Sequence, residues 1–147
     1  MTDASGPKPP EWSREDRRTF RTSLYRIIKV HPHFLNRFYE VFLASSPEIS
    51  EKFAHVDMEK QKTAVKESFF LIVSAATDRA PWALEQLNRL AHQHRKLNIT
   101  SEQYALWRKS LLNVVRECDP QFDEDVERSW LGMTNFGIHY LQHRPLK

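Results

Sequence analysis

Apolar side chains recur at steps of three and four residues through most of the chain, the period of an α-helix with one buried face. One long stripe in the middle of the chain is apolar except for a single glutamine, and consists of Gln61, Val65, Phe69, Ile72 and Ala76. Proline and polar residues interrupt the pattern at 31–32, 45–53, 77–81 and 119–124. The pattern predicts an all-α fold of six or seven helices.

Residue types typical of helix starts support these boundaries. Ser13 precedes two acidic residues and suits an N-cap, and Pro32 and Pro81 suit the first turns of the second and fifth helices. Thr100 followed by Gln103 is the pattern of a capping box. The segment 45–53 is expected to hold a short helix that ends near Phe53.

The N-terminal segment differs in composition from the rest of the chain. Residues 1–12 hold three of the eight prolines and one of the three glycines, and offer little apolar surface to bury. We therefore expect a disordered tail over 1–12 and one domain over 13–147.

Charge and cysteine content exclude several classes of protein. The 22 basic and 19 acidic residues are interspersed, which argues against a nucleic-acid-binding stripe. A single cysteine, Cys118, excludes an intramolecular disulfide framework and indicates a reducing compartment. The longest apolar run, at 69–76, is far short of the ~20 residues that span a bilayer. With no apolar leader at the N-terminus, we expect a cytoplasmic protein with no nucleic-acid or membrane partner.

Two histidines, His92 and His94, stand in the segment LNRLAHQHRKLNITSEQY (87–104). Residues two apart on a helix differ by about 200°, so the two side chains point away from each other and do not share a metal. His94 lies on the apolar stripe with Leu87, Leu90 and Ala91. The pattern alone leaves two interpretations of His94 open: a core imidazole bonded to a backbone carbonyl, or a metal ligand.

Two other polar residues interrupt apolar stripes, Tyr39 in the second predicted helix and Gln61 in the fourth. Each alone is compatible with an ordinary core position. Together with His94, they make three polar interruptions in separate helices, which indicate a shared polar pocket. The pattern does not identify the ligand of this pocket.

Four segments together resemble a bacterial globin, close to the globin part of flavohaemoglobins and their single-domain relatives. They are FYEVF (38–42), SPEISEKF (46–53), QKTAV (61–65) and AHQHRKLNITSEQY (91–104). The resemblance covers residues 13–143, and its most specific part is a histidine followed ten residues later by Tyr104. It implies a globin fold of six to eight helices that encloses a haem pocket.

The resemblance also assigns roles to individual residues. His94 would bind the iron of non-covalent haem b through one ring nitrogen, with the other bonded to a backbone carbonyl and with Tyr104 as a neighbour. Phe53 would pack on the porphyrin. Tyr39 and Gln61 would donate hydrogen bonds to a bound gas, and Val65 would restrict the space above the iron.

The expected function is reversible binding of oxygen and other diatomic gases such as nitric oxide and carbon monoxide. Nitric oxide detoxification is a further expectation, with a separate reductase because no flavin segment follows before Lys147; whether the protein is an enzyme stays open. Thr134 stands where flavohaemoglobins carry a tyrosine, and residues 131–147 contain no Asp or Glu, which argues against peroxidase-like activation. The alternatives are a gas sensor that signals to a partner protein and a haem-less regulatory module.

Overall fold

The computed structural model describes residues 11–143, without the side chains of residues 95, 96 and 143. All regular structure in this part of the chain is helical, which confirms the predicted all-α fold. The seven helices of the described residues are α1 (Arg14–Val30), α2 (Phe34–Ala44), α3 (Pro47–Lys52), α4 (Met58–Asp78), α5 (Pro81–Lys96), α6 (Ser101–Cys118) and α7 (Glu124–His143). None of them combines the length and apolar character that crossing a membrane requires.

Most helix starts lie where the sequence predicts them. The Ser13 hydroxyl accepts a hydrogen bond from the Asp16 backbone N–H at 3.0 Å, and α5 begins at Pro81. Thr100 and Gln103 form the predicted capping box. The second helix differs, since it begins at Phe34 and not near Pro32: the Phe34 N–H donates to the His31 carbonyl at 3.0 Å, so a turn occupies the residues between.

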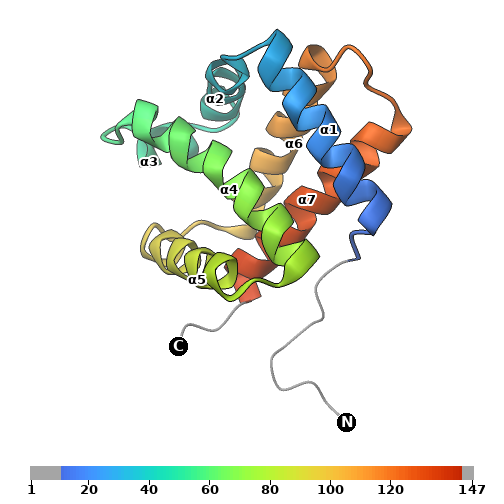
Figure 1. Ribbon diagram of the computed structural model, residues 1–147. Coiled ribbons are helices and arrows are strands. Elements are labelled where there is room, and N and C mark those ends of the chain that lie inside the picture. The colour runs from blue at the N-terminus through green and yellow to red at the C-terminus, as the bar shows by residue number, and fades with distance from the viewer. Residues whose placement is uncertain (1–10, 144–147) are drawn as a thin grey trace.

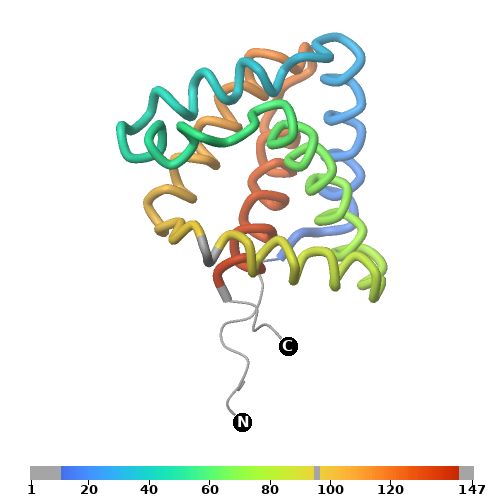
Figure 2. Tube along the Cα trace, turned by 90° about the vertical axis from the view of Figure 1, so that its left-hand side faces the viewer, coloured from blue at the N-terminus to red at the C-terminus, as the bar shows by residue number. Residues whose placement is uncertain are grey.

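Helix α1 packs against α7, and α4 contacts both; in Figure 1, α7 runs obliquely across the directions of α1 and α4. Three aromatic rings, Phe20, Phe69 and Trp130, join these helices in the core, with centroid separations from 4.7 to 6.4 Å. Figure 2 shows α5 at one end of the molecule and α2 with α3 at the other. The helices between them, α4, α6 and α7, therefore contribute to the walls of the space in which the candidate site lies.

A buried ion pair fastens α1 to the segment that follows α6. Asp119 accepts hydrogen bonds from Arg26 at 2.6 and 2.7 Å and from the Ser23 hydroxyl at 2.6 Å. The Trp130 indole N–H in turn donates to the Ser23 oxygen at 2.9 Å. Burial by itself would raise the pKa of Asp119, but the bonds from Arg26, Ser23 and the Gln121 backbone outweigh it and lower that pKa. The carboxylate is thus held ionised inside the fold.

The predicted tail boundary at residue 12 is wrong. Trp12 is 6% exposed and packs against Phe20 and Phe136, with ring centroids 5.6 and 6.2 Å away. A Cβ atom at Gly132 would overlap the Trp12 ring, so the indole lies directly on the backbone of α7. Residues 1–10 lie outside the described residues, and the expected disorder there stays a prediction.

Candidate functional site

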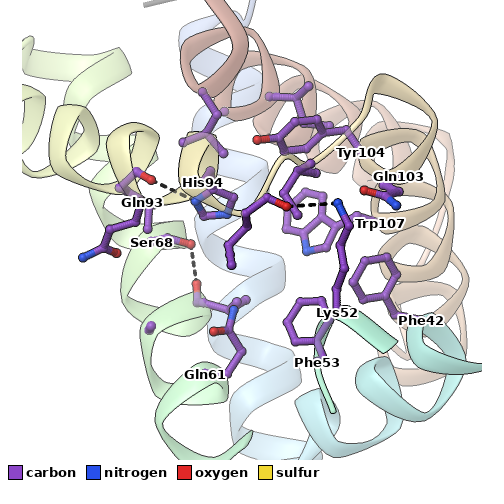
Figure 3. A pocket seen from close by; sticks show the side chains of 18 of the residues that line it. Phe42, Lys52, Phe53, Gln61, Ser68, Gln93, His94, Gln103, Tyr104 and Trp107 are labelled. Atoms are coloured by element: carbon purple, nitrogen blue, oxygen red, sulfur yellow. Dashed lines mark hydrogen bonds between the residues drawn. The ribbon is translucent and has the colours of Figure 1, made fainter. Parts of the chain in front are cut away.

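One largely apolar cavity is enclosed by residues from α2 to α7. The three polar residues that interrupt the apolar stripes, Tyr39, Gln61 and His94, all line it. Figure 3 shows His94 and Gln61 on different helices, α5 and α4, at the edge of the same space. Apolar side chains make up most of the remaining wall, among them Phe42, Ile49, Val65, Ile72, Leu87 and Ile138.

His94 has the geometry of an oriented, neutral imidazole. Its Nδ1 lies 2.9 Å from the Leu90 carbonyl oxygen one turn earlier in α5. Because a carbonyl only accepts, Nδ1 carries the proton and Nε2 keeps a free lone pair. Burial lowers the pKa of His94, against the opposing effect of the Leu90 bond, so the ring is uncharged at neutral pH. His92 is exposed, as the helical angle predicts, and does not line the cavity.

Tyr39 and Gln61 provide neutral donors from two other helices. Tyr39 is 3% exposed, and burial raises the pKa of its hydroxyl to about 12, although a side-chain hydrogen bond with Gln61 acts in the opposite direction. The hydroxyl therefore keeps its proton at neutral pH and remains a donor. The two side chains come from separate helices, α2 and α4, and line the same cavity.

The other residues singled out by the sequence also line this cavity. The ring of Phe53 lies 6.1 Å from Tyr39, and Val65 stands one turn after Gln61 in α4 with 9% of its surface exposed. The ring of Tyr104 stacks on His94 at 6.3 Å with an interplanar angle of 19°. The structure thus brings all six predicted site residues together; their roles toward a ligand stay predictions.

Sequence reasoning missed four polar residues of the cavity wall: Lys52, Ser68, Gln93 and Gln103. The Ser68 hydroxyl donates to the Val65 carbonyl at 2.6 Å, and the Gln103 carbonyl oxygen accepts the Thr100 N–H at 3.0 Å, so each is bonded within or next to its own helix. The capping pattern explained Gln103 without indicating that this side chain also reaches the cavity. For Lys52, no local pattern distinguishes it from a surface lysine.

The sequence model of the family described as Globin matches residues 36–135. The chain belongs to the globin family. A flavohemoprotein of Oceanobacillus iheyensis is 28% identical over 69% of this chain, and the match spans 26% of that longer relative. A solved structure is also similar: the protein PA3967 of Pseudomonas aeruginosa PAO1, described as structurally highly homologous to a human hemoglobin, is 31% identical. That structure superposes with a TM-score of 0.78, and the match covers 86% of this chain and 95% of the other.

Membership in the globin family supports a haem-based gas-binding function, and the cavity fits that cofactor. It offers a neutral imidazole with a free nitrogen, a largely apolar wall and two neutral hydrogen-bond donors on other helices. On the His94 side, the ring is oriented by a neutral carbonyl and not by a carboxylate, which leaves less negative charge on the imidazole. The Thr134 hydroxyl donates to the Leu131 carbonyl at 3.1 Å.

Proposed function

We propose that this globin binds non-covalent haem b through His94 and binds oxygen reversibly, in the cytoplasm. When bound, the haem would supply an iron able to hold a diatomic gas. The observation that carries the proposal is that His94, with its Nδ1 bonded to Leu90 and its Nε2 free, lines the same cavity as Tyr39 and Gln61.

The side chains of the cavity would have different roles in binding haem and gas. The Leu90 carbonyl fixes the plane and the tautomer of His94, and stacking on Tyr104 limits the rotation of the ring. Phe53 and Val65 contribute apolar surface that excludes water. Tyr39 and Gln61 would donate hydrogen bonds to the gas, which would favour oxygen, the better hydrogen-bond acceptor at such a site, over carbon monoxide.

Comparison of the two neighbouring histidines tests the assignment. We expect the purified protein to show a b-type haem spectrum, His94→Ala to lose most of the haem, and His92→Ala to keep it. Since haem binds only the folded chain, His94→Ala should also unfold at a lower temperature when both proteins are prepared with haem. A colourless parent protein would favour the haem-less module, and a colourless His92→Ala beside a normal His94→Ala would refute the choice of ligand.

We further propose that nitric oxide and oxygen are converted to nitrate, with one electron per cycle supplied by a separate reductase. The proposal is supported by the similarity to a protein named a flavohemoprotein, a name that joins flavin and haem. The 147-residue protein should consume nitric oxide once without a reductase and repeatedly when a flavin reductase and nicotinamide cofactor are added. Sustained turnover with the cofactor and this chain alone would contradict the need for a reductase, and no consumption at all would favour a sensor.

A further inference from the structure

Lys52 connects two segments that are distant in sequence. It is the last residue of α3, directly before Phe53, and its ammonium group donates to the carbonyls of Leu97 and Asn98 at 3.0 and 2.6 Å. Both carbonyls belong to the turn between α5 and α6, and Figure 3 shows the Lys52 side chain extended along the cavity with the bond to this turn dashed. One side chain thus bridges α3 and the end of the helix that carries His94.

This bridge lies where the cavity opens to solvent. Leu97 lines the cavity and yet is 49% exposed, which marks the turn as part of the cavity mouth. Lys52 lines the cavity beside it and is partly buried. Among the described residues of the wall, Lys52 is the only side chain with a permanent charge. The hydrogen bonds from Lys52 to the α5–α6 turn therefore lie across part of the cavity mouth and not in the closed interior.

The turn held by Lys52 is connected to the backbone of His94. The Leu97 N–H donates to the His94 carbonyl at 3.1 Å, and the next residue, Asn98, has a left-handed φ of 54°. Carbonyls at a helix C-terminus carry partial negative charge and lack partners within the helix, so an ammonium group is favourable there. Loss of Lys52 would leave these two carbonyls to solvent and free the turn to move away from α3.

We propose that Lys52 is a positioning residue that straps the α5–α6 turn to α3 across the cavity mouth and thereby slows the loss of haem. The inference rests on the proposed haem-binding function and adds the residue that controls retention. The strap acts through the turn behind His94 and through Phe53, which follows Lys52, so it couples the two walls between which haem would sit. Opening of the mouth then requires both bonds of Lys52 to break.

Three variants separate the hydrogen bonds from the bulk and charge of the side chain. Lys52→Met keeps the apolar stem without a donor, and Lys52→Arg restores donors that reach the turn. Lys62→Met is the matched control, because Lys62 is a partly buried lysine of the adjacent α4 that pairs with Glu59 at 3.0 Å. Because the hydrogen bonds of Lys52 are charge-assisted but lie at a partly exposed site, we expect Lys52→Met to transfer haem to excess apomyoglobin about three- to tenfold faster than the parent. Lys52→Arg and Lys62→Met should transfer it at rates within about twofold of the parent.

Two further measurements distinguish a strap from other roles. Amide hydrogen exchange of haem-free protein should accelerate at residues 97–99 in Lys52→Met, while the thermal unfolding temperature stays near that of the parent. Haem whose propionates are methyl esters should show the same acceleration of loss, because the strap does not need the carboxylates. If the acceleration vanishes with the ester, Lys52 pairs with the haem carboxylates and the strap is refuted.

The failure of the strap can be told from the failure of the proposed function. A parent protein that takes up no haem contradicts the function itself. A parent that retains haem no longer than Lys52→Met overturns the strap alone, as does a general rise of exchange through the fold.

Discussion

Replacement of Tyr39 by Phe removes one hydroxyl from the cavity and leaves the ring in place. The ring is 3% exposed and lies 4.8 Å from Phe38, 6.3 Å from Phe42 and 6.1 Å from Phe53, all as centroid separations. These contacts depend on the ring and not on the oxygen. We therefore expect Tyr39→Phe to fold and to bind haem as the parent does.

The expected size of the effect follows from the hydroxyl's environment. Burial raises its pKa to about 12, so the group is a neutral donor within a largely apolar cavity. A hydrogen bond to an acceptor that carries charge contributes roughly 1.5–3 kcal/mol, and each 1.4 kcal/mol corresponds to a factor of about ten. Oxygen should leave Tyr39→Phe on the order of ten- to a hundredfold faster, and carbon monoxide should change much less.

Stopped-flow measurement of oxygen release tests whether Tyr39 and Gln61 donate hydrogen bonds to oxygen. Gln61→Leu should also accelerate release, and the double variant should be non-additive, because Gln61 and Tyr39 line the same cavity and the Gln61 side chain affects the pKa of Tyr39. Release rates within about twofold of the parent for both single variants would show that neither donor reaches the ligand. His55 and Lys60, two nearby polar residues that are exposed and do not line the cavity, would then be tested as donors that swing inward.

Two further predictions concern the fold around the site. Gly132→Ala should lower the free energy of unfolding by about 1–3 kcal/mol, because its Cβ would overlap the rigid Trp12 ring. Gly137→Ala should lower it less, because its Cβ would meet only the terminal methyl of Ile72 at 2.8 Å. Equal losses for the two variants in chemical denaturation would contradict this. Asp119→Asn should cost about 2–4 kcal/mol at pH 7, since Arg26 loses its charged partner. Because the pKa of Asp119 is lowered in the folded state, its contribution to the free energy of unfolding is fully present above the unfolded-state pKa of about 4. The difference in this free energy between parent and variant should therefore shrink as the pH falls through the folded-state pKa. A difference that grows in acid would refute the role given to the Asp119–Arg26 ion pair.

The sequence by itself determined the helices and the direction in which most side chains point, because both depend on neighbours within one turn. The period of apolar residues, the Ser13 cap and the Thr100–Gln103 capping box are interactions over three or four residues, and the structure has them as predicted. The choice of His94 over His92 as the inward residue is of the same kind, since it needs only the helical angle.

Only the tertiary structure decided which side chains meet across helices. Three examples join residues more than a dozen positions apart: Tyr39 and Gln61 in one cavity, the indole of Trp12 on Gly132, and the bridge from Lys52 to Leu97. Such contacts depend on how whole helices cross, which no local period encodes. A lysine on a short helix has the same local sequence pattern whether its side chain points to water or to a neighbouring turn. The sequence therefore predicted from its stripes that Tyr39, Gln61 and His94 share a pocket, while the packing of α3 against the α5–α6 turn alone decided how the mouth of the cavity is closed.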